Sequence, residues 1–227
     1  MRSGVQRPSP VAAVISPVYC VPLALLLASG CAAQERQWEV GAAAGFGIMR
    51  NATISNLSGS ASAGVDDRFA AGVVFGQDLY QHLGGEVRYT FRDDDLVLKS
   101  GGSKVNMDGE SHLVQYDMLF HATGKSSRIR PYAAAGGGIR WFLGTGHEYV
   151  NQPLGNFALL TKTDEVKPLL SVGGGVRVRV GGRMDIRLDF RDYISPFPQR
   201  LFATAPGARI HGWLNDLVPF AGVSWLF

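Results

Sequence analysis

Cysteine is scarce in this chain of 227 residues, because its two cysteines, Cys20 and Cys31, both lie near the N-terminus. From residue 32 onward no intrachain disulfide can form. A secreted domain of this kind is held together by its strand pairing, its core or its membrane. Beyond residue 33 the sequence also lacks any run of about 18 apolar residues, which excludes a transmembrane helix there.

Net charge is also small. The chain carries 22 basic and 19 acidic side chains, and two of the basic ones, Arg2 and Arg7, lie within residues 1–33, which contain no acid. The rest of the chain is therefore nearly neutral, with 20 basic against 19 acidic side chains. A nearly neutral chain exerts little long-range attraction on polyanions, so we expect no nucleic-acid partner.

Charged residues are absent from position 8 to position 34. Two arginines precede the apolar core of this segment, and small residues at positions 29–33 follow it. A positive end, a short apolar run and a small-residue cleavage site are the three parts of a secretory signal. We therefore predict a signal peptide over residues 1–33.

Two details bear on how this leader is processed. Pro17 and Pro22 interrupt the apolar run, which disfavours a permanent membrane-spanning helix. Cleavage after Ala33 satisfies the small-x-small rule. The alternative is a bacterial lipobox ending at Cys31, which would leave a lipidated cysteine at the new N-terminus.

Segments with alternating apolar and polar residues recur after the leader. A period of two residues is typical of β-strands, and the 29 glycines of the chain favour turns and bulges over helices. We predict eight strands, at residues 38–48, 68–77, 85–92, 111–121, 132–143, 170–180, 184–193 and 217–227.

The connections between these strands alternate in length. Those after the second, fourth and sixth strands are short, and those after the first, third, fifth and seventh are long loops, at residues 49–67, 93–110, 144–169 and 194–216. Transmembrane β-barrels have short periplasmic turns and long outer loops. An even number of strands then puts both ends of residues 36–227 on the short-turn side.

The two faces of the strands indicate which side meets lipid. In a soluble barrel the apolar face points inward, whereas in an outer-membrane barrel it contacts lipid and the interior is polar. The apolar face here has aromatic residues near the strand ends, including Trp38, Trp141 and Trp225, as interfacial girdles require. We therefore predict an all-β fold, an eight-stranded antiparallel transmembrane up-and-down β-barrel with a polar interior.

Charges of both signs occupy the polar face, so they can pair within a narrow lumen. Eight strands enclose only enough space for side chains to fill, and we expect salt bridges to plug the lumen. Alanine and glycine at interior positions of 132–143 and 170–180 leave room for the long arginines. The predicted network comprises Glu86, Arg88, Arg92, Asp117, Arg140, Arg177, Arg179, Asp185, Arg187, Asp189 and Arg191.

The stretch VRVRVGGRMDIRLDFR, residues 176–191, contains one complete hairpin. Keeping both faces in step across its turn requires an odd number of loop residues, which predicts a loop at residues 181–183 and puts Arg183 in the periplasmic turn. This register pairs Arg179 with Asp185. It also sets Arg177 opposite Arg187, which is unfavourable unless Asp189, Glu86 or Asp117 lies close by.

The chain ends in apolar and aromatic residues at alternate positions, Val223, Trp225 and Phe227. With the stretches PYAAAGGG at 131–138 and RLDFRDY at 187–193, this ending resembles the outer-membrane protein β-barrel domain family, of the OmpA/OmpX-like eight-stranded kind. The resemblance covers roughly residues 36–227. It implies a location in the outer membrane of Gram-negative bacteria and insertion by the barrel-assembly machinery, which reads the C-terminal residues. It implies little about activity.

The sequence offers few residues for catalysis or metal binding. The five histidines have no metal-binding spacing. Ser195 and His211, with Asp192 or Asp216, could form a hydrolase site, but no nucleophile motif surrounds Ser195. The run at 93–95, three aspartates, could bind a divalent cation, although we interpret it as a solvated strand end.

We therefore expect a non-enzymatic envelope protein without cofactor or metal, structural or adhesive and porin-like in architecture. Its expected partners are outer-membrane lipids and an extracellular ligand that contacts the long loops, and we expect a monomer. Two alternatives stay open at this point: a lipid-modifying outer-membrane barrel enzyme, and a soluble calycin-like barrel that binds an apolar ligand.

Overall fold

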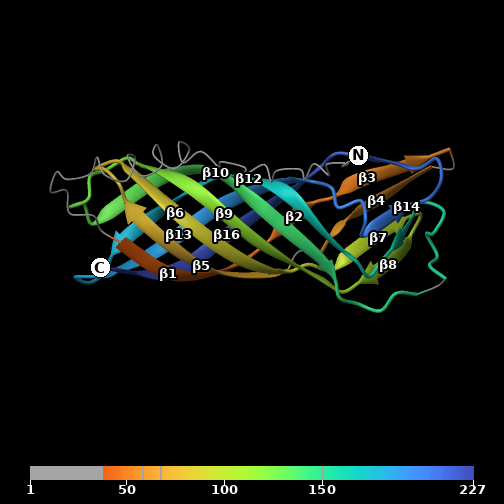
Figure 1. The fold of residues 1–227 in the computed structure, drawn as a ribbon, viewed down its shortest axis with the longest axis horizontal. Coiled ribbons are helices and arrows are strands. Elements are labelled where there is room, and N and C mark those ends of the chain that lie inside the picture. Colours follow the sequence, from red (N-terminus) through yellow and green to blue (C-terminus); the bar gives the residue numbers. More distant parts are fainter. Residues whose placement is uncertain (1–37, 58, 67, 150) are drawn as a thin grey trace, which may run out of the picture. The chain divides into compact units, whose positions relative to one another are not determined.

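Eight long strands form a closed antiparallel barrel in the computed structural model (Figure 1). The structure describes residues 38–227 except 58, 67 and 150, so the predicted leader at 1–33 lies outside the described residues. The barrel strands are β1 (Trp38–Phe46), β5 (Phe69–Asp78), β6 (Leu83–Asp93), β9 (Gly109–His121), β10 (Ile129–Gly144), β12 (Asp164–Arg179), β13 (Met184–Pro196) and β16 (Trp213–Leu226). In the described part of the chain, no helix is long and apolar enough to span a membrane.

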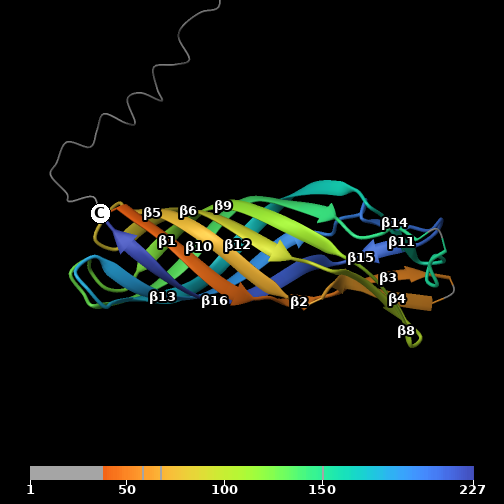
Figure 2. The same cartoon turned by 90° about the horizontal axis from the view of Figure 1, so that it is seen from below.

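Each barrel strand pairs with the barrel strand that follows it in the sequence, and β1 pairs with β16 to close the ring (Figure 2). A short strand, β2 (Ile48–Arg50), continues β1 past Gly47 and also pairs with β16. The eight strands predicted from the alternation are therefore confirmed. They are 9 to 16 residues long, and about 9–11 residues are enough for a tilted strand to cross a bilayer.

The orientation of the two faces is that of a membrane barrel. Along β13, Leu188 and Phe190 are 52% and 48% exposed, whereas Asp189 and Arg191 are 5% and 0% exposed. Charged side chains thus point into the barrel and apolar ones point out. The soluble calycin-like alternative is wrong, because a soluble barrel needs the reverse arrangement.

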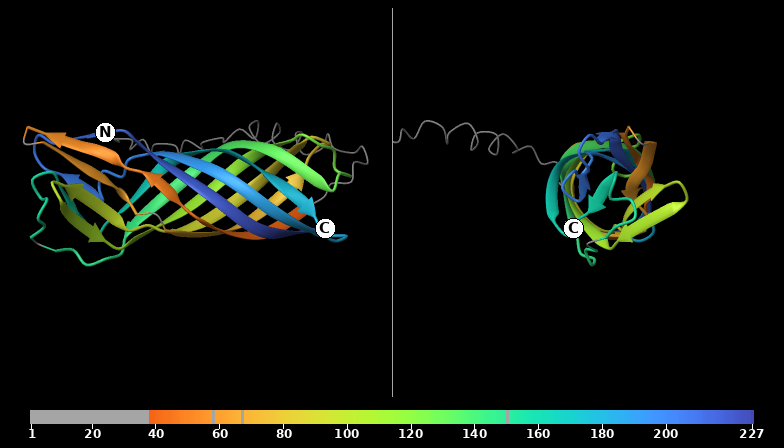
Figure 3. Two further views of the ribbon diagram at one scale, coloured as in Figure 1. Left: turned by 180° about the vertical axis from the view of Figure 1, so that it is seen from behind. Right: turned by 90° about the vertical axis from the view of Figure 1, so that its right-hand side faces the viewer.

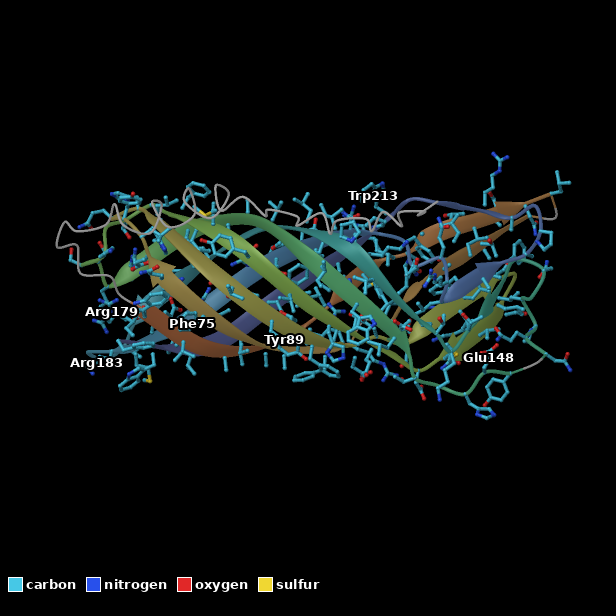
Figure 4. The ribbon with its side chains drawn as sticks, viewed as in Figure 1. Phe75, Tyr89, Glu148, Arg179, Arg183 and Trp213 are labelled. Atoms are coloured by element: carbon cyan, nitrogen blue, oxygen red, sulfur yellow. The ribbon has the colours of Figure 1, made fainter. Side chains whose placement is uncertain are left out.

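Aromatic side chains stand on the outer surface, as predicted. Trp38 stacks on Phe75 with ring centroids 5.1 Å apart, and the hydroxyl of Tyr89 lies 2.8 Å from Nδ1 of His112. Figure 4 shows Phe75 and Tyr89 pointing away from the barrel. Such rings suit the boundary between hydrocarbon and headgroups.

The hairpin at residues 176–191 has the predicted register. Arg179 pairs with Asp185 and Arg177 with Arg187. The amides of Val180 and Gly181 both donate to the carbonyl of Met184, so the loop at 181–183 is confirmed and Arg183 lies exposed in the turn.

The long connections are not the loops that the sequence suggested. They form a five-stranded sheet of β15 (Arg209–His211), β3 (Ala52–Asn56), β4 (Gly59–Val65), β7 (Leu96–Ser100) and β8 (Ser103–Met107), in that order, and a pair of β11 (Ala158–Leu160) with β14 (Phe202–Thr204). All of these strands lie at one end of the barrel (Figure 3). That end is extracellular, because outer-membrane barrels have their long connections outside.

This extracellular β-structure has an apolar core of its own. Ile54 and Leu98 are 0% exposed, and Phe202, from the connection after β13, is 0% exposed in the same cluster. The core forms because short alternating segments in separate connections each have one apolar face to bury. Burial of roughly 25 cal/mol per Å² of apolar surface favours order over loose loops.

Glycines inside the barrel make room for the arginines, as predicted. A Cβ atom on Gly173 would lie 2.1 Å from the carbonyl oxygen of Phe190 and 2.9 Å from Cδ of Arg191. One on Gly175 would lie 2.8 Å from Oδ1 of Asp189. These strands can approach so closely only without side chains.

Gly173→Ala tests this packing. We expect it to lower the free energy of unfolding by about 1–3 kcal/mol, the usual cost of overfilling a packed interior. Urea titration of the barrel in detergent micelles, followed by heat-modifiable gel migration, measures the change. The control is Gly182→Ala, because no atom lies within 4 Å of a Cβ at this turn position. Equal stability of the two variants would contradict the packing argument.

Candidate functional site

The barrel interior is the main concentration of charged side chains in the described chain, and Glu86 lies at its centre. This carboxylate, on β6, is 0% exposed. Its Oε1 lies 2.9 Å from Nη2 of both Arg88 and Arg191, and its Oε2 lies 2.7 Å from Nη2 of Arg187. Arg177 is 3.8 Å away. A buried carboxylate needs such partners, because burial without them costs several kcal/mol.

The facing pair Arg177 and Arg187 is neutralised by two carboxylates. Glu86 is one of them, as anticipated. The second is Glu39 of β1, which was not predicted: it lies 2.8 Å from Nη1 of Arg187 and also binds Arg177. Asp189 is 3.5 Å from Arg187, but Asp117 binds Arg191 instead, at 3.0 Å.

Further ion pairs complete this inner cluster. Asp189 binds Arg88 at 2.9 Å, and Asp78 binds Arg130 at 2.6 Å. Five carboxylates thus face five guanidinium groups, and the members are Glu39, Asp78, Glu86, Asp117, Asp189, Arg88, Arg130, Arg177, Arg187 and Arg191. Arg179 and Asp185 form a separate pair at the periplasmic mouth, 3.1 Å apart.

A second, outer cluster lies nearer the extracellular end. Nη1 of Arg92 is 2.6 Å from Oδ1 of Asp216, and Nη2 of Arg140 is 2.6 Å from Oδ2 of Asp94. Cross pairs of 3.3 Å join Arg92 to Asp94 and Arg140 to Asp216, and the hydroxyl of Ser111 accepts a hydrogen bond from Arg140. Two cations again face two anions.

This outer cluster corrects the interpretation of residues 93–95 as a solvated strand end. Asp94 and Asp95 are 1% and 3% exposed, because Asp94 belongs to the cluster and Asp95 binds Arg68. Only Asp93 is partly exposed, 3.1 Å from Arg68. Among the described residues, no group of three or more His, Cys, Asp or Glu side chains could hold a metal ion.

An apolar layer separates the two clusters. Leu113, Leu169, Tyr193, Val218 and Phe220 pack together with exposures of 0–4%. Their places along the strands show the layering: on β9 Leu113 lies between Ser111 and Gln115, and on β13 Tyr193 lies beyond Arg191. Packed side chains therefore fill the barrel between the two clusters. An ion crossing the lumen would need a polar path through this layer.

The outer and inner charges also contact aromatic faces. The guanidinium of Arg88 lies 5.5 Å from the ring centroid of Phe220 in the apolar layer. That of Arg140 lies 4.5 Å from Phe142, which belongs to the core of the extracellular β-structure. These distances are within the range of cation–π attraction. Such contacts connect the inner cluster to the apolar layer, and the outer cluster to the core of the extracellular β-structure.

Outside the barrel, one exposed ion pair anchors the β7–β8 hairpin. Nζ of Lys104 donates to Asp66 at 2.9 Å, and Lys99 lies 3.6 Å from the same carboxylate. The hydrogen bond from Lys104 lowers the pKa of Asp66 below its ordinary value. The two lysines face each other across the hairpin, and Asp66 relieves their repulsion.

Ser195, Asp192 and Asp216, which were considered for a hydrolase, are not brought together in the described structure. Ser195 points into the barrel, is 0% exposed, and its hydroxyl has no hydrogen-bond partner among the described residues. Asp216 is bound to Arg92 and Arg140. Asp192 lies on the opposite face of β13 from Ser195, because side chains alternate along a strand.

The C-terminal residues point outward. Val223, Trp225 and Phe227 are 52%, 51% and 57% exposed, and the amide of Phe227 donates to the carbonyl of Trp38. The last strand therefore closes the barrel against the first. Recognition of these three residues by the assembly machinery stays a prediction.

Glu86→Gln tests the inner cluster. The change leaves four arginines with too little negative charge in a closed interior, so we expect the free energy of unfolding to fall by about 3–5 kcal/mol. Asp66→Asn is the control, because an exposed ion pair contributes about 1 kcal/mol or less. Urea titration in detergent micelles measures both. Similar losses of unfolding free energy in the two variants would contradict the argument that the buried arginines depend on Glu86 for charge neutralisation.

Comparisons with known proteins found similar solved structures and one matching family model. Among solved structures, a major outer membrane protein from Thermus thermophilus is similar over 86% of this chain and 100% of that chain, with 12% identity and a TM-score of 0.50. Neisserial surface protein A covers 86% of this chain and 100% of that chain, with 16% identity and a TM-score of 0.48. The N-terminal β-barrel domain of Pseudomonas aeruginosa OprF covers 83% and 97%, with 11% identity and a TM-score of 0.43.

At these identities the structural likeness bears on the fold alone. No curated protein matches the sequence. The model of the outer membrane protein beta-barrel domain matches residues 23–198, which is more than half of the chain. The charged interior, the apolar exterior and this match lead to one conclusion: the chain belongs to the outer membrane protein beta-barrel domain family.

Proposed function

We propose that this chain is a non-enzymatic outer-membrane protein that contacts a ligand or a neighbouring surface through its extracellular β-structure. The observation that carries the proposal is the separate apolar core of that structure, in which Ile54, Leu98 and Phe202 are 0% exposed. A cored sheet holds its exposed residues in fixed positions, and a preorganised surface loses less entropy on binding than mobile loops do.

The tip of this β-structure offers side chains for contact. Leu57, at the β3–β4 turn, and Tyr149, in the connection after β10, are both exposed apolar residues. The two segments approach each other, because the side-chain amide of Asn56 donates to the carbonyl of Asn156 at 2.8 Å. Exposed apolar residues on a rigid extracellular tip suit a binding surface.

The interior supports a role other than transport through the lumen. The inner and outer ion clusters each have balanced charge, and the apolar layer around Leu113 and Phe220 fills the space between them. The burial of Ser195, whose hydroxyl has no hydrogen-bond partner in the described part of the chain, supports a non-enzymatic role. We also propose that the barrel works as a monomer in contact with outer-membrane lipids, inserted by the barrel-assembly machinery.

Leu57→Ser combined with Tyr149→Ser tests the contact surface. Bacteria displaying the wild type should be retained on at least one of three surfaces, which are collagen, a sulfated polysaccharide and a layer of the same bacteria. We expect the double variant to lose most of this retention, because apolar contacts at the tip are removed. The count of retained cells, normalised to surface expression, is the measurement.

Tyr80→Ser is the matched control, because Tyr80 is exposed in a periplasmic turn at the opposite end of the barrel. This variant should be retained like the wild type. Equal retention of the double variant and the wild type on all three surfaces would overturn the proposed role of the tip.

A further inference from the structure

An apolar groove runs along the outer surface of the barrel where β1 meets β5 and β16. It consists of two adjoining hollows of about 370 and 540 Å³, which share Ala42, Val73 and Val223. The first hollow is nearer the periplasmic end, where Met184 and Trp225 form its wall. The second continues toward Tyr89, whose place on the outer face is visible in Figure 4.

Strand register creates this groove. Ala44 pairs with Ala71 on one side and with Ala221 on the other, so three methyl groups lie in a row across β5, β1 and β16. Larger outward residues surround this row, and Phe69 and Val40 are 51% and 47% exposed. The result is a channel in the lipid-facing surface, with a floor of small side chains and walls of large ones.

A cation stands at the periplasmic end of the groove. Arg183 directly precedes Met184 of the groove wall, and its carbonyl accepts a hydrogen bond from the amide of Leu226 at 2.8 Å. Its side chain is exposed at the end of the barrel, as Figure 4 shows. Asp185, the acid of this hairpin nearest its turn, is already bound to Arg179.

We propose that the groove is a phospholipid site, in which one acyl chain lies along the alanine floor and Arg183 binds the phosphate. A guanidinium binds phosphate oxygens through paired hydrogen bonds. The hollows are within the size range of ligand pockets, about 300–1,000 Å³, and they lie on the face that contacts lipid. Arg183, at the periplasmic turn, is at the level of the inner-leaflet headgroups.

A flexible acyl chain fits this groove better than a second barrel does. Two barrels are both convex, so they touch along a line and leave a concave channel between them empty, and an empty channel forfeits dispersion contacts. The described short turns of a second copy would also offer no anion to Arg183, because their exposed charges, including Arg128 and Arg183, are basic. Charge and shape therefore select the same occupant. The inference does not depend on the proposed role of the extracellular tip.

The test uses the full barrel reconstituted in nanodiscs of phosphatidylethanolamine and phosphatidylglycerol, then released and examined by native mass spectrometry. Wild-type protein should retain one phospholipid. Ala42→Leu places a larger side chain at the junction of the two hollows, and we expect its lipid affinity to fall about tenfold. Ala135→Leu is the matched control, because Ala135 faces outward on β10, away from the groove.

The headgroup contact has its own pair of variants. Arg183→Gln should weaken phospholipid retention about fivefold, which corresponds to about 1 kcal/mol for one basic side chain near a lipid surface. Arg128→Gln, in another periplasmic turn, should retain lipid like the wild type. Diacylglycerol, which has no phosphate, should bind the wild type and Arg183→Gln equally.

Three results would overturn the proposal. One is equal lipid retention by Ala42→Leu and Ala135→Leu, and another is equal retention by Arg183→Gln and Arg128→Gln. The third is a dimer in the wild-type spectrum that Ala42→Leu dissociates, which would assign the groove to a second copy. Gel migration before and after heating checks that every variant is folded.

Discussion

Charges inside a barrel without room for bulk water must be paired, and the rest of this structure depends on that constraint. Glu86 on β6 contacts Arg187 and Arg191 on β13, although β6 is flanked by β5 and β9. These pairs therefore cross the lumen and join opposite walls. Removing one member of a pair leaves its partner as an unpaired charge in a medium of low dielectric. The register of each strand must therefore place its charged residues at the same height along the barrel axis as their partners.

The same constraint explains the division of the interior into layers. The inner cluster balances five carboxylates with five guanidinium groups, and the outer cluster balances two with two. Between them, Leu113, Leu169, Val218 and Phe220 of the apolar layer have hydrocarbon side chains, which need no polar partners. Arg140 links the outer cluster to Phe142 in the core of the extracellular β-structure. The extracellular β-structure therefore packs directly on the closed end of the barrel interior.

Most of the barrel could be predicted from the sequence, because alternation alone fixes which side chains point inward. The loop parity at residues 181–183 even fixed the register of one hairpin, and it exposed the conflict between Arg177 and Arg187. Asp78 and Arg130 were missed because they lie one and two residues beyond the predicted strands 68–77 and 132–143. Glu39 lies within the predicted strand 38–48, on the face opposite Trp38 and Val40, but it was not included in the predicted network.

Other features depend on contacts between distant segments, which a single sequence does not show. Asp94 and Asp216 looked like loop residues, but β16 begins early enough to include Asp216, and Asp94, directly after β6, is buried against Arg92 and Arg140. The extracellular sheet was read as loops because its strands have only three to seven residues. The groove requires Ala44, Ala71 and Ala221 to meet in one row, and this meeting follows from barrel closure.

The closed interior is tested most directly by cysteine labelling. In a chain whose two native cysteines are replaced by serine, Val218→Cys lies in the apolar layer and Asn106→Cys lies exposed on β8. A charged methanethiosulfonate reagent should label Asn106→Cys fully in the folded, membrane-inserted protein and label Val218→Cys only after unfolding. Labelling of both positions at similar rates in the folded barrel would contradict the account of a lumen sealed by paired charges and an apolar layer.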